Sequence, residues 1–418
     1  MKKEINFGIG FITGRANICK IINSYYEFII KQVEKLEYKV NFTIFILYDV
    51  NYLNTKEEEF YKINSDVSKY FKIKYLSPEY VFNKKNEVMN KHDLTEEEAS
   101  LIIGKGYAKA RNTILYEAIE EGIDYLLYWD DDEYPLAAIK EEKGIRWVEQ
   151  KNILQHIKNI ENADVTYGYR CGIINPLPYV DYNKIVTEDV YKRFIEAIEN
   201  EVVSWEKIKK VQEKEENIGY ANDEIASYKY KNIKMNNIGE KDFVLGSGIC
   251  LNLAHIEKIP AFYNPPQARG EDTFFSCALK EKNAKVLQIP VYHFHDAFLK
   301  YTNLMNKKYP KKLKKISSKD NSIASRFRRT ILGWIKYKPL LFYILDKKSY
   351  RERIDKAKLN LEKSVKEMSS IFPNCDLMDL VEILNEYDNN VQKHYEEYKT
   401  VNEIWNKIKY NIKGEKNA

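Results

Sequence analysis

The chain has 418 residues, of which 44% are apolar and 31% are charged, and this composition excludes an intrinsically disordered or fibrous protein. Its length is enough for one large domain with a smaller one beside it. The formal net charge is +5, but residues 301–350 alone carry +12, so the rest of the chain sums to −7. The basic character is therefore confined to one stretch.

The cysteine pattern and the hydropathy indicate a cytoplasmic protein. The cysteines are scattered singly without a CxxC pair, so neither a disulfide framework nor a zinc site is expected: Cys19, Cys171, Cys250, Cys277 and Cys375. The N-terminus lacks the cleavage site of a signal peptide. The longest later apolar run, residues 339–345, is far shorter than the roughly 20 residues that span a bilayer, so we expect no transmembrane helix.

The first hundred residues predict an α/β unit with parallel strands. Continuous apolar and β-branched residues predict strands over 5–13, 40–48 and 70–76. Apolar residues spaced three and four apart over 17–36 predict a helix between the first two strands, which implies a right-handed parallel crossover. Thr95, which three glutamates follow, predicts the start of a further helix.

A glycine-rich turn precedes the next predicted helix. Residues 104–112 read Gly-Lys-Gly-Tyr-Ala-Lys-Ala-Arg-Asn, and the helix is expected to continue to Ile119. Such an entry offers backbone N–H groups and the positive end of the helix dipole to a phosphate group, and Arg111 adds charge. Helices often begin with glycine, so the motif gains weight only from its place one helix before a group of acids.

Those acids, residues 130–133, belong to the stretch 125–135, which reads Tyr-Leu-Leu-Tyr-Trp-Asp-Asp-Asp-Glu-Tyr-Pro. The other candidate residues are organised around this stretch. Its apolar half predicts a strand buried on both faces, with the acids at the strand's carboxyl end, where open α/β sheets bind ligands. Adjacent carboxylates repel each other unless a cation or a proton relieves them, and such oxygen ligands suit magnesium or manganese. The alternative is a solvated acidic turn that Pro135 ends.

The middle of the chain combines regular elements with an insertion. A helix is expected over 145–160 and a strand over 163–169. The charged and mostly helical pattern of residues 181–240 indicates an insertion over one face of the sheet.

Two glycines and two acids follow the insertion. A strand is expected over 243–251, and Gly246 and Gly248 within it permit close approach of a backbone or a ligand. Glu271 and Asp272 then open a further helix. Acids are also ordinary residues of a first helical turn, so a purely structural role is the alternative.

The last predicted strand leads to two histidines. Residues 286–291 predict the strand, and His293 and His295 beyond it project to one face because strand side chains alternate. A single histidine is more often structural than a ligand, and the acid group earlier in the chain gives the two roles equal weight here.

In this order the motifs resemble the family 2 glycosyltransferases of the GT-A fold. The resemblance rests on residues 106–112, the acids of residues 130–133, the glycines at 246 and 248, the run 270–273 and His295, and it covers about residues 1–300. It implies a Rossmann-like α/β fold with a mixed, mainly parallel sheet flanked by helices, followed by a basic, mostly helical region over 301–418. It also implies a nucleotide-sugar donor, a divalent metal (Mn or Mg), and transfer of the sugar with inversion to a hydroxyl of a glycan, lipid-linked or peptide acceptor.

The resemblance further implies roles for individual residues. The residues placed near the nucleotide sugar are Thr13, Gly14, Arg15, Asp49, Arg111, Asp130 and Asp131. Asp130 and Asp132 match the two acids of the family's DxD motif, with Asp132 the more direct metal ligand. His295 completes the metal shell, with His293 in reserve.

The second acid pair matches the acceptor side of the reaction. Asp272 corresponds to the general base, and Glu271 orients the acceptor or substitutes for the base. The chemistry makes the same demands, because a nucleoside diphosphate leaving group requires charge stabilisation by a metal and helix N-termini. Single displacement requires one carboxylate within hydrogen-bond reach of the acceptor nucleophile.

Residues 307–345 combine lysines and arginines with Trp334 and aliphatic side chains. This pattern suits peripheral contact with the anionic inner face of a membrane, and equally an acidic protein partner. The alternative is that the lysines face solvent and the apolar residues pack on the catalytic domain. No nucleic-acid-binding motif accompanies the charge, so no nucleic-acid partner is expected.

Residues 348–412 predict two or more amphipathic helices, broken at residues 373–374, with the next helix beginning at residue 377. We expect a small helical domain that packs on its neighbour or pairs in a homo-oligomer.

Two other functions fit parts of the pattern. A nucleotidyltransferase would place a glycine-rich loop with lysine or arginine directly after the first strand, where only Gly14 and Arg15 stand. A non-catalytic scaffold or interaction protein of the same fold would lose one acid site, yet both are present. A glycosyltransferase is therefore the leading hypothesis.

Overall fold

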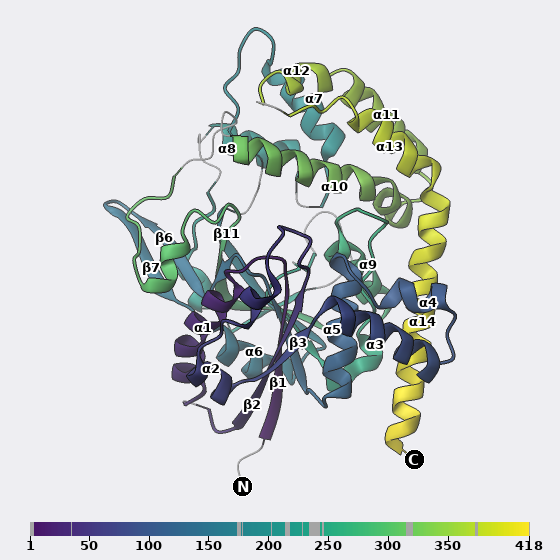
Figure 1. Ribbon diagram of the computed structural model, residues 1–418. Coiled ribbons are helices and arrows are strands. Elements are labelled where there is room, and N and C mark those ends of the chain that lie inside the picture. Colours follow the sequence, from purple (N-terminus) through teal and green to yellow (C-terminus); the bar gives the residue numbers. More distant parts are fainter. Residues whose placement is uncertain are drawn as a thin grey trace.

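The computed structural model describes residues 4–34, 36–173, 177, 179–201, 203–213, 218–227, 229–233, 243–244, 246–314, 321–372 and 375–417. In this part of the chain a mixed sheet is flanked by helices on both faces, and a layer of helices that is mostly C-terminal lies above one end of it (Figure 1). The protein is thus a mixed α/β protein with a helical C-terminal region.

The sheet has the strand order β3-β2-β1-β4-β10-β8-β11-β5, with β9 also paired to β11. The strands are β1 (Glu4–Thr13), β2 (Lys39–Tyr48), β3 (Lys72–Leu76), β4 (Tyr125–Trp129), β5 (Glu133–Tyr134), β8 (Val165–Ile173), β9 (Lys231–Ile233), β10 (Ile249–Asn252) and β11 (Val286–Asp296). Strands β1 to β4 run parallel to one another, whereas β10 runs antiparallel to β4 and β8. Because β1 pairs with β2 on one side and β4 on the other, the carboxyl ends of all three meet at one edge.

Two layers of helices bury the faces of the sheet. One face packs on α1 (Ile18–Val33), α2 (Ser65–Tyr70) and α6 (Asn152–Ile160). The other packs on α3 (Pro78–Lys91), α4 (Glu96–Ile102), α5 (Tyr107–Glu120) and α9 (Glu271–Glu281). Thr95 caps α4 with a full capping box, which confirms the helix start predicted there. Short 3₁₀ helices cover residues 57–61, 223–227, 253–258 and 302–306.

The helix predicted over 145–160 is half wrong. Residues 145–149 of the predicted helix belong instead to β7 (Gly144–Glu149), which pairs with β6 (Leu136–Glu141) in an antiparallel hairpin. Helix α6 begins only at Asn152. Trp147 in β7 packs its ring on Phe294 at 4.9 Å between centroids. This tertiary contact favours the extended conformation that the apolar residues of the segment also permit.

Two predicted strands have different bounds. The strand predicted over 243–251 begins only at Ile249, because Gly248 has φ +67°, a left-handed conformation outside the strand region; Leu245 lies outside the described residues. The last strand continues past residue 291 to Asp296, so His293 and His295 lie within β11. Its pairing with β8 shifts register between Gln288 and Tyr292, which marks a bulge.

The helical layer contains α10 (Asn321–Leu345), α11 (Tyr350–Glu362), α12 (Val365–Ser369) and α13 (Leu380–Asn389). Two helices of the insertion, α7 (Glu188–Ile198) and α8 (Trp205–Glu213), join it, and α7 packs against α10, α11 and α12 (Figure 1). The prediction that the insertion lies over a face of the sheet is therefore wrong for α7, because the apolar side chains of α7 pack against the C-terminal helices instead. The predicted break at residues 373–374 lies outside the described residues, and the helix expected from residue 377 begins at Leu380.

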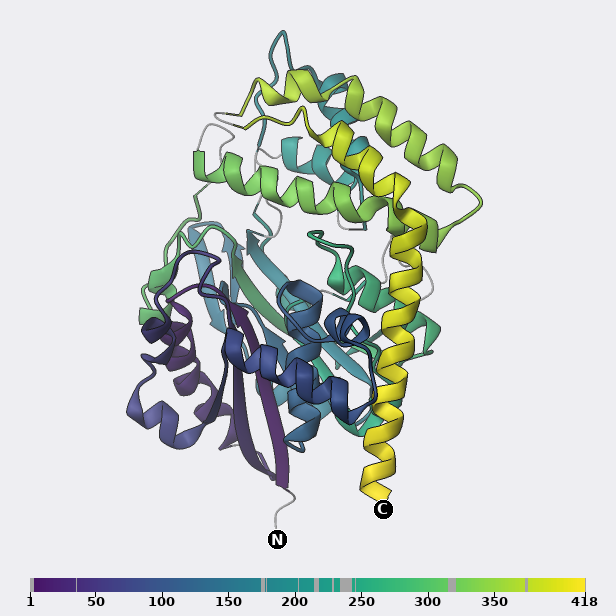
Figure 2. The ribbon, with the colours of Figure 1, turned by 45° about the vertical axis from the view of Figure 1, so that its right-hand side comes forward.

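The last helix, α14 (Val391–Asn417), contacts both the C-terminal helical layer and the sheet domain. It runs from the helical layer down the side of the sheet domain (Figure 2), where the indole of Trp405 donates a hydrogen bond to the Ile259 carbonyl at 3.0 Å. In α10, the apolar residues at 331, 334, 335 and 340–342 are buried inside the protein. Among the described residues, no helix is both long enough and apolar enough to cross a membrane. The five cysteines are buried and free.

Candidate functional site

The first acid group lies where β4 ends, next to the end of β1. Because Phe11 pairs with Trp129, the turn after β1 reaches the acids after β4. The Thr13 hydroxyl donates a hydrogen bond to Asp131, and the Arg15 guanidinium donates to Asp131 and, at 3.2 Å, to Asp132. Burial raises the pKa of Asp131 to about 6 and Arg15 opposes that rise. Asp131 therefore fastens the turn of residues 13–15 to the acid group.

Asp132 faces the histidine that the sequence placed in the metal shell. The Nε2 atom of His295 lies 3.6 Å from Asp132 Oδ1. The backbone fixes this meeting, because Asp296 N–H donates to the Asp132 carbonyl at 2.8 Å and His295 pairs with Glu133 in the β5–β11 ladder. Burial lowers the pKa of His295 to about 4, so the imidazole is neutral near pH 7 and keeps a lone pair for a cation.

Asp132 and His295 are the two predicted metal ligands that the structure brings together, and Asp132 also faces Arg15 and Arg326. Among the described residues, no group of three or more histidine, cysteine, aspartate or glutamate side chains is placed to hold a metal. Asp130 is turned toward Arg111, whose Nη2 lies 3.8 Å from its carboxylate. Magnesium and manganese are often held by one or two protein ligands, with substrate phosphates and water in the other positions. Asp132 and His295 meet that minimum.

Arg111 stands between the two acid groups. It is buried, its Nε lies 3.6 Å from Glu271, and its Nη2 is the atom that faces Asp130. Its guanidinium lies over the rings of Tyr128 and Phe262, at 5.0 and 5.5 Å from their centroids. The stacking fixes the plane of the cation, so one arginine links the acids of β4 to those of α9.

The second acid group is held by backbone donors. Asp272 accepts hydrogen bonds from Gly246 N–H and Thr273 N–H, both at 3.0 Å. A Cβ at Gly246 would lie 3.0 Å from the Asp272 carboxylate, so a larger residue there would press on Asp272. Asp272 remains partly exposed, whereas Glu271 is only 9% exposed. The carboxylate of Asp272 is thus oriented by the backbone, and the residue keeps part of its surface exposed.

The end of β2 completes the nucleotide side of the predicted site. Asp49 N–H donates to the Thr13 carbonyl at 2.9 Å, and the Asp49 carboxylate lies 3.6 Å from Lys105 in the glycine-rich turn. Tyr52 covers Gly14 so closely that a Cβ there would be 2.5 Å from the Tyr52 Cβ. The structure therefore brings the turn after β1, Asp49 and the glycine-rich turn together.

Two residues of the motifs serve the interior of the protein. Glu133 is fully buried, accepts from the Ser247 hydroxyl and lies 3.1 Å from Arg170 Nε. The Trp129 indole donates to His293 Nδ1 at 2.9 Å, so in the neutral ring the proton sits on Nε2 and no lone pair is left for a metal. His293 is therefore not suited to the reserve role predicted for it.

Sequence reasoning missed several charged residues that face the acids. Arg326 of α10 lies 3.8 Å from Asp132, Arg170 of β8 pairs with Glu133, and Glu201 of the insertion accepts a hydrogen bond from Thr273, the residue after Asp272. No spacing or motif marks these residues, because each comes from an element that is distant in the sequence.

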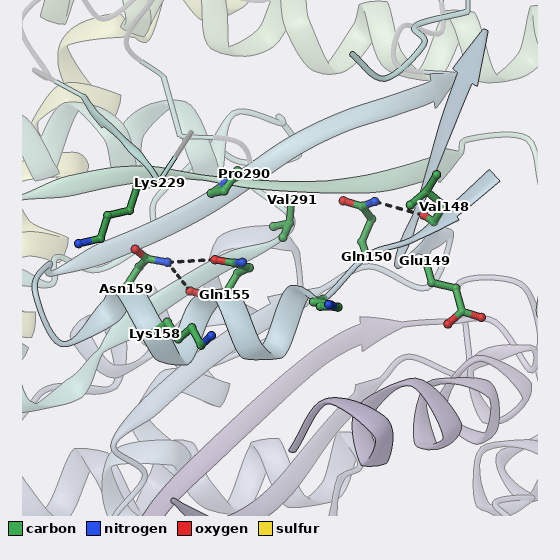
Figure 3. Close-up of a pocket in the computed structure, with 10 residues that line it drawn as sticks. Val148, Glu149, Gln150, Gln155, Lys158, Asn159, Lys229, Pro290 and Val291 are labelled. Atoms are coloured by element: carbon green, nitrogen blue, oxygen red, sulfur yellow. Dashed lines mark hydrogen bonds between the residues drawn. The ribbon is translucent and has the colours of Figure 1, made fainter. Parts of the chain in front are cut away.

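A cavity of about 580 Å³ lies away from these residues, between the end of β7, α6 and the bulge of β11 (Figure 3). On its α6 side the Asn159 amide donates to the carbonyl and the side-chain oxygen of Gln155, and Pro290 and Val291 line the β11 side. None of the residues predicted for the site lines this cavity.

The geometry thus defines a site at the carboxyl edge of an α/β sheet, with two acid groups that Arg111 links. Two cations, Arg15 and Arg326, lie beside Asp132 of the first group, and Lys105 of the glycine-rich turn lies beside Asp49. No protein-family profile matches the chain, and no curated protein matches its sequence significantly.

Proposed function

We propose that this protein is a metal-dependent, inverting glycosyltransferase of the GT-A type, which transfers a sugar from a nucleotide-sugar donor to an acceptor hydroxyl. The observation that carries the proposal is the division of the acids into two groups at one sheet edge, one beside His295 and one at the start of α9. Each group matches one half of the reaction: departure of a nucleoside diphosphate, and attack by a hydroxyl.

The first group serves the donor. Asp132 and His295 would hold a divalent metal, which when bound supplies positive charge to the diphosphate leaving group. Asp49, Gly14 and Arg15 bind the nucleoside part, for which the turn after β1 and the end of β2 are adjacent. Arg326 adds a guanidinium from the helical layer, 3.8 Å from Asp132.

The second group serves the acceptor. Asp272 accepts the proton of the attacking hydroxyl as general base, since two N–H groups orient its carboxylate and the residue is partly exposed. Glu271 lies beside it against Arg111, where it orients the acceptor. The acceptor is a hydroxyl of a glycan, a lipid-linked sugar or a peptide, and the reaction takes place in the cytoplasm or at the membrane's inner face.

The test begins with thermal unfolding of the purified protein in the presence of nucleotides and nucleotide sugars, with and without manganese. A ligand that binds only the folded state raises the free energy of unfolding by about RT ln(1 + [L]/Kd), and the unfolding midpoint rises with it. A selective shift of the midpoint therefore identifies the base and the sugar. The expected result is a manganese-dependent shift with one diphospho-sugar, lost in Asp132→Ala and retained in the control Asp66→Ala, whose side chain is 78% exposed.

Transfer is then assayed with that donor and a panel of acceptors. Asp272→Asn should keep the donor-induced shift and lose transfer by about 100-fold or more, the usual contribution of a general base. A shift with nucleoside triphosphates alone would favour a nucleotidyltransferase. Normal transfer by Asp272→Asn would refute the role of Asp272, and the absence of any shift would refute the donor site.

A further inference from the structure

Glu201 is a buried acid that the proposed reaction does not yet use. It lies in the insertion between α7 and α8 and is 8% exposed. Its Oε1 accepts hydrogen bonds from the Thr273 hydroxyl at 2.6 Å and the Tyr337 hydroxyl at 2.8 Å. Glu201 therefore joins three elements: the insertion, the first turn of α9 and helix α10.

Thr273 connects this acid to Asp272. Its backbone N–H donates to Asp272 Oδ1 at 3.0 Å, and its hydroxyl donates to Glu201. One residue thus holds both carboxylates, and any movement of Glu201 is transmitted to the residue next to the predicted base.

Tyr337 braces the same arrangement from α10. Its ring is buried and lies over Gly270, the residue before α9, where a Cβ would come within 2.9 Å of the ring. Gly270 has φ +94°, so the chain enters α9 in a conformation that favours glycine. The start of α9 therefore packs against the Tyr337 ring, and the Tyr337 hydroxyl donates a hydrogen bond to Glu201.

We propose that Glu201 is a positioning residue for Asp272: through Thr273 and Tyr337 it ties the insertion and helix α10 to the first turn of α9 and fixes the Asp272 carboxylate toward the acceptor. This inference rests on the proposed function, because it assigns Asp272 the part of the base. It also gives the insertion and the helical layer a role in the reaction centre.

The charges around Asp272 point the same way. Burial raises the pKa of Asp272, and the negative charge of Glu201 is the next contribution in the same direction. The other charged or titratable groups that face it come from several elements: Arg111 of α5, Arg170 of β8, Glu271 of α9 and Tyr337 of α10. The two arginines lower the pKa of Asp272, so Glu201 offsets them and keeps the carboxylate basic.

On balance the surroundings of Glu201 raise its pKa, and its ionised form is the one that acts on Asp272. Burial raises the pKa of Glu201, while the hydrogen bonds from Thr273 and Tyr337 and the nearby Lys338 lower it. Glutamine at this position keeps the shape and one acceptor oxygen but carries no charge. Glu201→Gln should therefore lower the pKa of Asp272 and shift the acidic limb of the pH–rate profile to lower pH.

The experiment compares Glu201→Gln with Glu199→Gln, a matched control in the same segment whose side chain is exposed. In the transfer assay, Glu201→Gln should lower kcat about tenfold or more, leave the KM for the donor unchanged and shift the acidic limb, because a small misplacement of a base is costly. Thr273→Val should lower kcat similarly, and Thr273→Ser, which keeps the hydroxyl, should restore it. If the wild type is active, a kcat equal to the wild-type value and an unshifted acidic limb of the pH–rate profile in Glu201→Gln would overturn the proposal.

A second measurement does not require transfer. The Asp272 carboxyl is titrated by NMR with ¹³C-labelled aspartate and assigned with Asp272→Asn. A lower Asp272 pKa in Glu201→Gln, but not in Glu199→Gln, supports the proposal, and an unchanged value overturns it. A protein that lacks transfer but shows this shift would fail the proposed function while keeping the link between the two acids.

Discussion

Replacing His156 by glutamine should make the protein less sensitive to acid. His156 lies on α6, is 0% exposed and places Nδ1 2.8 Å from the Thr166 hydroxyl. Burial lowers the pKa of His156 to about 3, because the charged ring would lose its hydration. In the unfolded chain the pKa of a histidine is about 6.5, so between these values the unfolded state binds more protons. The free energy of unfolding therefore falls as the pH drops below about 6.5.

The magnitude follows from the two pKa values. With about 3 in the folded state and about 6.5 in the unfolded state, His156 alone lowers the free energy of unfolding by about 2 kcal/mol between pH 8 and pH 5. Glutamine can still hydrogen-bond to Thr166 and has no charge to gain. Any change in packing is the same at both pH values, so it cancels from the difference. His293, whose pKa is lowered first by burial and next by His156, is present in both proteins, so the contribution of burial, its largest one, cancels as well.

The assay is urea denaturation of the wild type and His156→Gln at pH 8 and pH 5, followed by circular dichroism. The wild type should lose about 2 kcal/mol more than the variant between the two pH values. An equal loss in both proteins would refute the reasoning, because it would mean that His156 accepts its proton without cost in the folded state.

Two further predictions use matched pairs of variants. Arg326→Gln should weaken binding of the diphosphate donor by about tenfold or more, because Arg326 lies beside Asp132. Arg329→Gln, at an exposed position on the same helix, should leave the affinity unchanged. Calorimetric titration measures both affinities, and equal values would remove Arg326 from the donor site. Gly270→Ala should destabilise the protein by about 1 to 3 kcal/mol more than Gly122→Ala, because both glycines have positive φ but only at Gly270 would the new Cβ meet a buried ring, that of Tyr337. Urea denaturation measures the difference, and equal losses would show that Tyr337 can move aside.

The sequence predicted most of the parallel α/β unit, because β1, β2 and β4 are largely buried and read as continuous apolar runs. Strands β1, β2 and β4 and helices α1 and α5 lie close to their predicted residues, and Asp49 and Asp130 fall where strands β2 and β4 end. The segment 145–149 was mistaken for a helix, since its apolar residues fit either period and packing of Trp147 decided the outcome.

The candidate site was predictable only in its outline. The meeting of Asp132 with His295 was anticipated from motif order, and the structure places the two side chains 3.6 Å apart. The exclusion of His293 was not, because its hydrogen bond to Trp129 joins residues 164 positions apart in the sequence. A sequence pattern reports which side chains are present but not which partner each one finds.

The sequence by itself determined where β2 and β4 end and which acids stand there, because hydrophobic runs and their polar boundaries are local properties of the chain. Only the tertiary structure decided that Arg15 neutralises Asp131, that Glu133 is buried on Arg170, and that Arg326 and Glu201 reach the site from beyond the sheet. These contacts depend on long-range packing and on desolvation of charges, and both arise only when distant elements are brought together.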